Sequence, residues 1–269
     1  MSRELIKENV IQNKKRSIKL FNNMLEGLIN DPSGKLLKKA DLLSYWLKDF
    51  AFYIQHEESF DSTRLISYKR GDVIRINFGF NVGKEFGGLH YAVVIDNDNK
   101  HNADVITVIP LSSTDGRKIH ARNVDLGSEI YTKVIAVQDG LLKKAKDALV
   151  DIKTLEDAFS DAVSLIKNGA AEDDFDISTS QVRSAFEAKQ NLENKRKEII
   201  KSISIIERNN TEIKKLKYGG MAIPNQIRTL SKQRIYTPKK SEDFLYGISL
   251  SASAMDKIDE KLRELFLFK

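Results

Sequence analysis

The chain has 269 residues, of which 41% are hydrophobic and 30% are charged, so it can bury a sizeable core and form one or two domains. It contains no cysteine, which excludes disulfides, thiol chemistry and cysteine-based zinc sites. The net charge of +6 neither demands nor excludes a nucleic-acid partner. Because we find neither the apolar core of a secretory signal nor an apolar run near the ~18 residues of a membrane span, we expect a cytoplasmic protein.

The N-terminal quarter predicts two helices. Apolar residues fall on one broad face of residues 2–29, turn residues interrupt the pattern at 30–34, and a second, strongly apolar helix is expected over 35–55. We therefore predict an N-terminal helical hairpin within residues 1–67. It would pack on the rest of the protein, or it would be a partner-binding or autoinhibitory arm.

Short strands are expected in the next part of the chain. Residues 71–78 alternate between apolar and polar side chains, and 90–96 and 104–111 are nearly continuous apolar runs. Residues 123–126 predict a weak fourth strand and 130–137 a fifth. Loops rich in Gly, Asn and Asp separate the first three strands, a pattern typical of a small β-barrel or sandwich.

The apolar spacing then changes. Apolar residues seven apart predict a helix over 141–168 and a second over 180–217, which Ser178 or Thr179 would cap. We expect residues 141–217 to form a long antiparallel hairpin inserted into the strand-rich part, since closing a surface loop costs little more as it lengthens. It would be a structural or dimerisation arm, an RNA-guiding arm, or a built-in regulator.

A third helical region ends the chain. The sequence returns to a strand at 221–223 and ends in a helix over 251–266, for which Ser251 or Ser253 suits the N-cap position.

Six short motifs occur in one order along the chain: GDV at 71–73, NVGKEFGG at 81–88, AVVIDND at 92–98, VIPLSS at 108–113, QIRT at 226–229 and LS at 250–251. In this order they resemble the MazF/PemK-type toxin endoribonucleases of type II toxin–antitoxin systems, over roughly 69–136 and 220–268. The resemblance implies an α+β fold: an SH3-like small β-barrel, built from residues 68–140 and 218–269, with a C-terminal helix.

The resemblance also implies a reaction. The family cleaves single-stranded RNA without a metal: the ribose 2′-hydroxyl attacks the adjacent phosphorus, the 5′-oxygen leaves and a cyclic phosphate forms. Such chemistry needs a base, an acid and donors for the phosphorane charge. It implies no cofactor and no metal, and it implies three partners: single-stranded RNA (mRNA), an antitoxin protein and a second copy in a homodimer.

Two family positions carry different residues here. His90 stands where the family usually has Arg, and Ser112 stands where it usually has Thr. The serine keeps a hydroxyl donor. The histidine titrates near neutrality and suits acid–base catalysis, but it lacks the fork that grips a phosphate bidentately. We expect His90 to be general base or acid and Ser112 to orient or stabilise the phosphate.

RNA-binding residues are expected around the glycine-rich loop. Lys84 and Glu85 lie in this loop, and Gly87 and Gly88 end it. Glycines let the backbone approach a phosphate closely. The resemblance therefore implies that these four residues shape the RNA groove, whereas the residues alone also fit a flexible hairpin loop.

Three further residues are candidates. Arg75 alternates outward from the first strand and would contact phosphate or solvent. His120 would form a base–acid pair with His90 if it faced the same groove. The resemblance suggests that Arg228 lies near the dimer interface and the groove.

Two other functions stay open. Without the family arginine, the protein would be a catalytically inactive RNA- or protein-binding module whose helical arms bind a partner. Alternatively, the helical regions would act as an antitoxin in cis that covers the groove.

Overall fold

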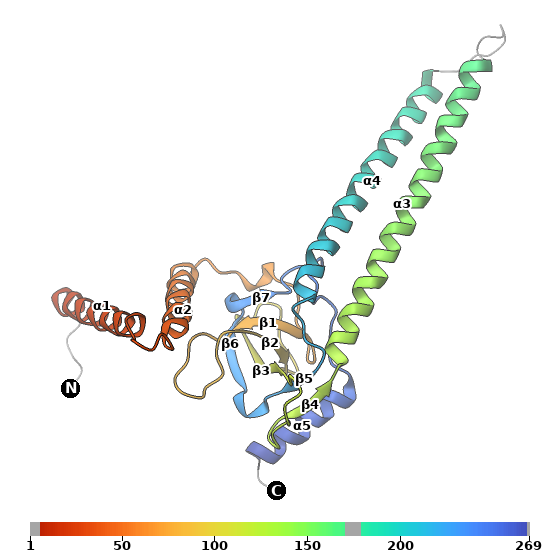
Figure 1. The fold of residues 1–269 in the computed structure, drawn as a ribbon. Helices are drawn as coiled ribbons and strands as arrows, with labels where there is room; N and C mark the ends of the chain where they lie inside the picture. Colours follow the sequence, from red (N-terminus) through yellow and green to blue (C-terminus); the bar gives the residue numbers. More distant parts are fainter. Residues whose placement is uncertain (1–5, 170–178, 268–269) are drawn as a thin grey trace.

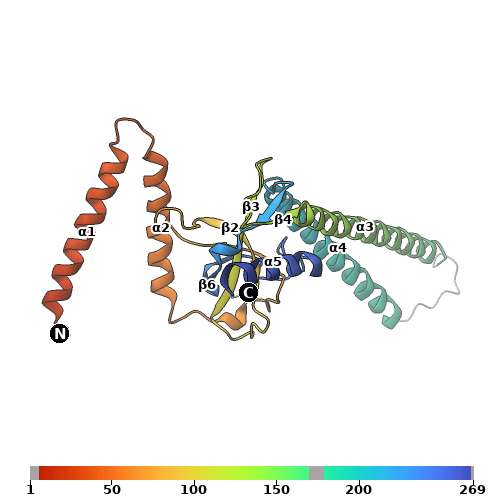
Figure 2. The same ribbon diagram turned by 90° about the horizontal axis from the view of Figure 1, so that it is seen from below.

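The computed structural model describes residues 6–169 and 179–267. They form a seven-stranded antiparallel sheet and five α-helices (Figure 1). Two pairs of helices extend from opposite sides of the sheet, and the last helix lies against it, as the view from below in Figure 2 also shows. None of the helices in the described part is long and apolar enough to cross a membrane.

Strands β1 to β5 match expected positions closely, whereas β6 and β7 were not expected from the sequence and one expected strand is a helix, as described below. Their bounds are β1 Val73–Asn77, β2 Leu89–Val94, β3 Val105–Ser113, β4 Val124–Gly127, β5 Gly220–Ala222, β6 Arg228–Ser231 and β7 Ile235–Thr237. The helices are α1 Lys7–Ile29, α2 Leu37–His56, α3 Glu129–Gly169, α4 Thr179–Ile213 and α5 Ala252–Phe266. Residues 2–5 of the first expected helix and the proposed cap Ser178 lie outside the described residues.

The sheet runs in the order β4-β5-β3-β2-β1-β7, and β6 pairs with the first half of β3. Strands β6 and β7 lie on one stretch of chain, interrupted by a 3-10 turn at Lys232–Arg234. This stretch therefore pairs with β3 at one end and with β1 at the other. Within the described residues no ladder joins β4 to β7, so strand pairing does not close the sheet, and the SH3-like barrel stays a prediction.

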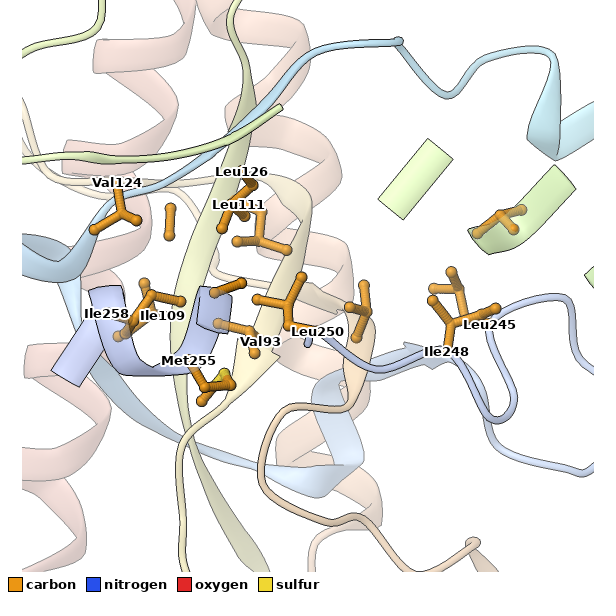
Figure 3. Close-up of a cluster of buried hydrophobic side chains, with 14 of the residues drawn as sticks. Val93, Ile109, Leu111, Val124, Leu126, Leu245, Ile248, Leu250, Met255 and Ile258 are labelled. Carbon is orange, nitrogen blue, oxygen red and sulfur yellow. The ribbon is translucent and has the colours of Figure 1, made fainter. Parts of the chain in front are cut away.

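Both faces of the sheet are buried. On one face Val93 and Ile109 pack with Ile258 of α5 (Figure 3). Val134 of α3 belongs to the same cluster. The opposite face carries a second cluster: Ile74, Ile76, Phe78, Ala92, Val94, Ile106 and Val108. A strand buried on both faces needs apolar side chains at consecutive positions, which explains why β2 and β3 read as nearly continuous apolar runs.

The expectation of a fifth strand over 130–137 is wrong, because α3 already begins at Glu129. The β-branched residues of this segment favour a strand locally. However, Ile130 and Val134 stand four residues apart, at helical spacing, and Val134 is fully buried in the core while Ile130 packs beside it. Burial of this one face outweighs the local preference, since most helical stability in proteins comes from packing.

The long helical hairpin (α3 and α4) projects from the sheet (Figures 1 and 2). At about 1.5 Å per residue, the 41 residues of α3 extend about 60 Å. Ile152 and Ile206, which lie on the two predicted apolar stripes, are buried. At the base, the Asn209 side chain donates to the Glu242 carbonyl at 3.3 Å.

The N-terminal hairpin (α1 and α2) contacts the sheet through α2. The Asn77 side chain of β1 donates to the Asp49 carboxylate at 3.1 Å, and Arg234 lies 5.0 Å from the centre of the Trp46 ring. By contrast, α1 contains no buried residue. The expected packing of this hairpin on the sheet is therefore made by its second helix.

Candidate active site

A cavity forms where β2 and β3 separate. Their ladder ends at the pair Ala92–Pro110, and beyond this point β3 pairs with β5 instead, with Ser112 opposite Met221. Proline has no backbone N–H to donate to a ladder, and the Pro110 carbonyl accepts from the Ile223 amide at 3.0 Å. Two more residues of β2–β3 pairing would have set His90 directly opposite Ser112.

His90 and Ser112 line this cavity together. It has a volume of about 200 Å³, and we call it the His90 cavity. Its other lining residues come from β2, β3, the end of β4, the start of α3, and the segment from the end of α4 to the first residue of β5: Tyr91, Leu111, Ser113, Gly127, Ile130, Tyr131, Lys215, Leu216, Lys217, Gly219 and Gly220. The structure thus brings the two predicted catalytic residues to one site.

The imidazole of His90 is held in a neutral state near pH 7. Burial lowers its pKa, and the nearby positive charge of Arg75 lowers it further. Its ring packs 4.6 Å from the Phe86 ring, centre to centre. Within the described residues neither its ring nitrogens nor the Ser112 hydroxyl makes a hydrogen bond. An unprotonated imidazole with a free lone pair is what a general base requires.

Two lysines that sequence reasoning missed line the same cavity. Lys215 pairs with Glu212 at 2.6 Å and Lys217 with Asp115 at 2.7 Å. Their side chains are 63% and 58% exposed, and exposed ion pairs are weak enough to be exchanged for a phosphate. The signal in the sequence was the basic run at 214–217, one residue before the Gly219-Gly220 pair.

Tyr91 is a further polar residue of the His90 cavity. Burial raises the pKa of its hydroxyl, so the group keeps its proton at neutral pH. A phenol that stays protonated can donate a hydrogen bond or a proton to a nearby oxygen.

The glycine-rich loop lies beside this cavity and is braced against the segment that leads into β6. The Phe86 amide donates to the Gln226 side chain at 3.1 Å. A Cβ atom on Gly87 would lie 2.7 Å from the Gly79 carbonyl oxygen, and Gly88 has a φ of +88°. Both positions therefore need glycine.

The other RNA-binding candidates near the loop, Lys84, Glu85 and Arg228, make contacts within the protein and are only partly available to a ligand. Glu85 and Arg228 form an ion pair at 2.9 Å, so each neutralises the other. Lys84 is exposed, and its carbonyl accepts from Gln226 at 3.4 Å. The structure therefore brings Glu85 and Arg228 together, and Glu85, Gly87 and Gly88 line one cavity with His90.

Arg75 and His120 are placed differently. Arg75 lies between the rings of Tyr91 and Tyr236, with Cζ 5.8 Å and 5.2 Å from their centres. It acts on His90 through its charge and does not line the cavity. His120 sits in an exposed turn, where its Nδ1 accepts from the Arg122 amide at 3.2 Å. It does not line the cavity either, so the suggested His90–His120 pair is not assembled there.

Residues 69–163 match the family of PemK-like, MazF-like toxins of type II toxin–antitoxin systems. This stretch of the chain is therefore similar to that toxin family. The match covers β1 to β4 and most of α3, and it includes both His90 and Ser112. The further resemblance to the MazF/PemK family over 220–268 lies outside this match and stays a prediction. A comparison with curated proteins gave no significant match.

Proposed function

We propose that the protein is a toxin-like endoribonuclease that cleaves single-stranded RNA without a metal, with the His90 cavity as its active site. The observation that carries this proposal is the meeting of His90, Ser112, Lys215 and Lys217 around one cavity. Acid–base, hydroxyl and cationic groups are the three types of group that the reaction needs. Within the described residues no group of three or more His, Asp or Glu side chains could hold a metal ion.

Each residue takes one role in the proposed mechanism. Neutral His90 removes the proton of the ribose 2′-hydroxyl, and the oxygen attacks the adjacent phosphorus. The Ser112 hydroxyl and the two lysines stabilise the charge that develops on the phosphorane oxygens. The bond to the 5′-oxygen breaks, and Tyr91 donates a proton to that oxygen. The products are a 2′,3′-cyclic phosphate and a 5′-hydroxyl end.

The two lysines compensate for the absence of the family arginine in the proposed active site. The family arginine is replaced by His90, which cannot bind a phosphate bidentately. Lys215 and Lys217 supply two positive charges at the same cavity, although as point charges rather than as a fork. In this proposal the two lysines at the base of the long hairpin supply the positive charge that the family arginine, replaced by His90 in β2, would have supplied.

Further properties of the toxin family are proposed on the same grounds. We propose an SH3-like barrel of residues 68–140 and 218–269, with an N-terminal hairpin within 1–67 and an inserted hairpin at 141–217. The double pairing of the β6–β7 stretch supports this arrangement. The family also implies an antitoxin protein and a homodimer as partners, in the cytoplasm.

The test is cleavage of a long, mixed-sequence RNA by purified protein in EDTA, with the ends mapped. We expect discrete cuts that leave a cyclic phosphate, and we expect His90→Ala to abolish them. His120→Ala is the matched control, and it should cleave normally because His120 lies in an exposed turn outside the cavity.

The same experiment separates the second candidate function. Folded wild-type protein that binds the RNA but makes no cuts would refute the nuclease and support a catalytically inactive RNA-binding module. The replacement of the family arginine by His90 is the observation that favours this alternative. Cleavage by the His90→Ala variant would show that the active site is not the His90 cavity.

A further inference from the structure

A second and larger cavity lies on the other side of His90. It has a volume of about 660 Å³ and opens between α2 and the glycine-rich loop; we call it the α2 cleft. His90 lines both the α2 cleft and the His90 cavity, so the two sites meet at this side chain. A strand of RNA held at His90 would therefore extend into the α2 cleft.

One face of α2 forms a wall of this cleft. Lys38, Leu42, Tyr45 and Asp49 stand four, three and four residues apart and all line it, a spacing that places side chains on one side of a helix. Tyr45 is 58% exposed and Leu42 is 50% exposed. This helix lies outside the toxin-family match at 69–163, so the wall is a feature of this chain beyond the matched domain.

The wall has the groups that a nucleobase needs. An exposed tyrosine ring can stack on a base, and such stacking carries much of single-strand binding. The ammonium of Lys48 lies 4.9 Å from the centre of the Tyr45 ring, and Lys38 adds a second positive charge at the cleft. Aromatic rings interleaved with lysines are typical of surfaces that bind the bases and phosphates of single-stranded RNA.

Asp49 supplies a hydrogen-bond acceptor beside this ring. Its Oδ2 accepts from the Asn77 side chain at 3.1 Å, which holds the carboxylate in place. Asn77 is itself braced, because its Oδ1 accepts from the Gly79 amide at 2.9 Å. The Oδ1 atom of Asp49 makes no hydrogen bond with another described residue, and a carboxylate accepts well from the exocyclic amino group of a base.

We propose that the α2 cleft binds the base of a nucleotide next to the cleaved bond, with Tyr45 as the stacking surface and Asp49 as the acceptor for an exocyclic amino group. The identity of the ligand as RNA rests on the proposed function. The cleft would make the nuclease prefer cytosine over uracil at this position, because uracil carries no amino group.

Trp46 makes the test direct. It is the single tryptophan of the chain and it lines the α2 cleft, so binding in the cleft should change its emission. The probe is an eight-nucleotide 2′-O-methyl oligocytidine, which lacks the attacking hydroxyl and is not cut by the proposed mechanism. We expect saturable quenching of Trp46, and weaker quenching by the corresponding oligouridine.

Variants then assign the contacts. Tyr45→Ala should weaken binding of the oligocytidine about tenfold or more, and Tyr45→Phe should restore it because the ring is kept. Asp49→Asn should reduce the difference in binding affinity between the oligocytidine and the oligouridine. Tyr246→Ala is the matched control, since Tyr246 is also exposed, at 48%, and lines neither cavity; its binding should equal that of the wild type.

The outcomes distinguish this inference from the proposed function. RNA cleavage by the wild type without any change in Trp46 emission, and with normal binding by Tyr45→Ala, would overturn the α2 cleft and leave the nuclease in place. Quenching that depends on Tyr45 in a protein that cuts no RNA would support the cleft and refute the catalysis. Equal binding of the two oligonucleotides would overturn the role of Asp49.

Discussion

The guanidinium of Arg75 lies 3.0 Å from the carboxylate of Glu212, so an ion pair ties β1 to the base of α4. Only 22% of the Arg75 side chain and 31% of the Glu212 side chain are exposed, and a pair that is largely shielded from water is screened less by salt. Arg75 also lowers the pKa of His90. One residue therefore both anchors the long hairpin and tunes the proposed catalytic base.

Glu212→Gln should lower the free energy of unfolding by about 1 kcal/mol, because Arg75 would lose its counter-charge in a partly buried place. Thermal or urea unfolding measures this loss. Glu187→Gln is the matched control: its pair with Arg183 is 83% and 62% exposed, so we expect no measurable change. Equal effects of the two substitutions would argue against a special role for the Arg75–Glu212 pair.

The Glu212 effect should depend on pH. A hydrogen bond from Lys215, followed by the charges of Lys215 and Arg75, lowers the pKa of Glu212 below its usual 4.5. A carboxyl with a lowered pKa in the folded state stabilises the protein above the unfolded-state pKa and loses this effect as the pH falls through the folded-state value. The difference between wild type and Glu212→Gln should therefore be full at pH 7 and shrink below about pH 4.5.

Arg75→Met should move the acid limb of the cleavage profile to higher pH. Burial and then the Arg75 charge lower the pKa of His90, and removing that charge makes protonation of the imidazole easier. A general base works only when unprotonated, so activity would be lost at a higher pH than in the wild type. The measurements are kcat/KM against pH and an NMR titration of His90.

Arg64→Met is the control for this shift, since Arg64 is 82% exposed and pairs with Asp61. An acid limb that does not move in Arg75→Met, while the NMR pKa of His90 does, would mean that another group is the base.

Ser112→Ala should lower kcat by about 10²-fold, the usual effect of removing one donor to transition-state charge. Ser112→Thr should retain most of the activity because it keeps the hydroxyl. Single-turnover cleavage of a short RNA separates this loss from a change in binding. An alanine variant as fast as the wild type would remove Ser112 from the mechanism.

Lys215→Ala and Lys217→Ala should each weaken RNA binding and reduce its dependence on salt. For single-stranded RNA, each lost phosphate contact lowers the slope of log K against log salt by about 0.7. Lys214→Ala is the matched control, because Lys214 belongs to the same basic run but does not line the His90 cavity. The same slope in all three variants would show that the run contributes only diffuse charge.

Local sequence patterns were sufficient where the spacing of apolar residues within one element decides its structure. The alternating and continuous apolar runs predicted β1, β2 and β3, and the heptad spacing predicted the long hairpin. Ser251 or Ser253 was expected as the N-cap of the last helix, and the Ser251 side chain does accept from the Ala254 amide at 3.2 Å. These features depend on residues within one or two turns of each other.

The pattern failed at residues 130–137, where β-branched residues suggested a strand. There, contacts with distant parts of the chain stabilise the start of α3. Glu129 accepts from the Ser251 hydroxyl at 3.1 Å, and Val134 is buried in the core. Contacts with residues more than a hundred positions away are invisible to a reading of local period.

The sequence by itself determined most of the helices and strands, the family resemblance and the two candidate catalytic residues, because these follow from short-range pattern and motif order. Only the tertiary structure decided which groups meet. The end of the β2–β3 ladder at Pro110 opened a cavity between His90 and Ser112. The return of α4 to the sheet brought Lys217 to that cavity, and the docking of α2 set Tyr45 beside it. Such meetings depend on long-range packing, which no local spacing of residues encodes.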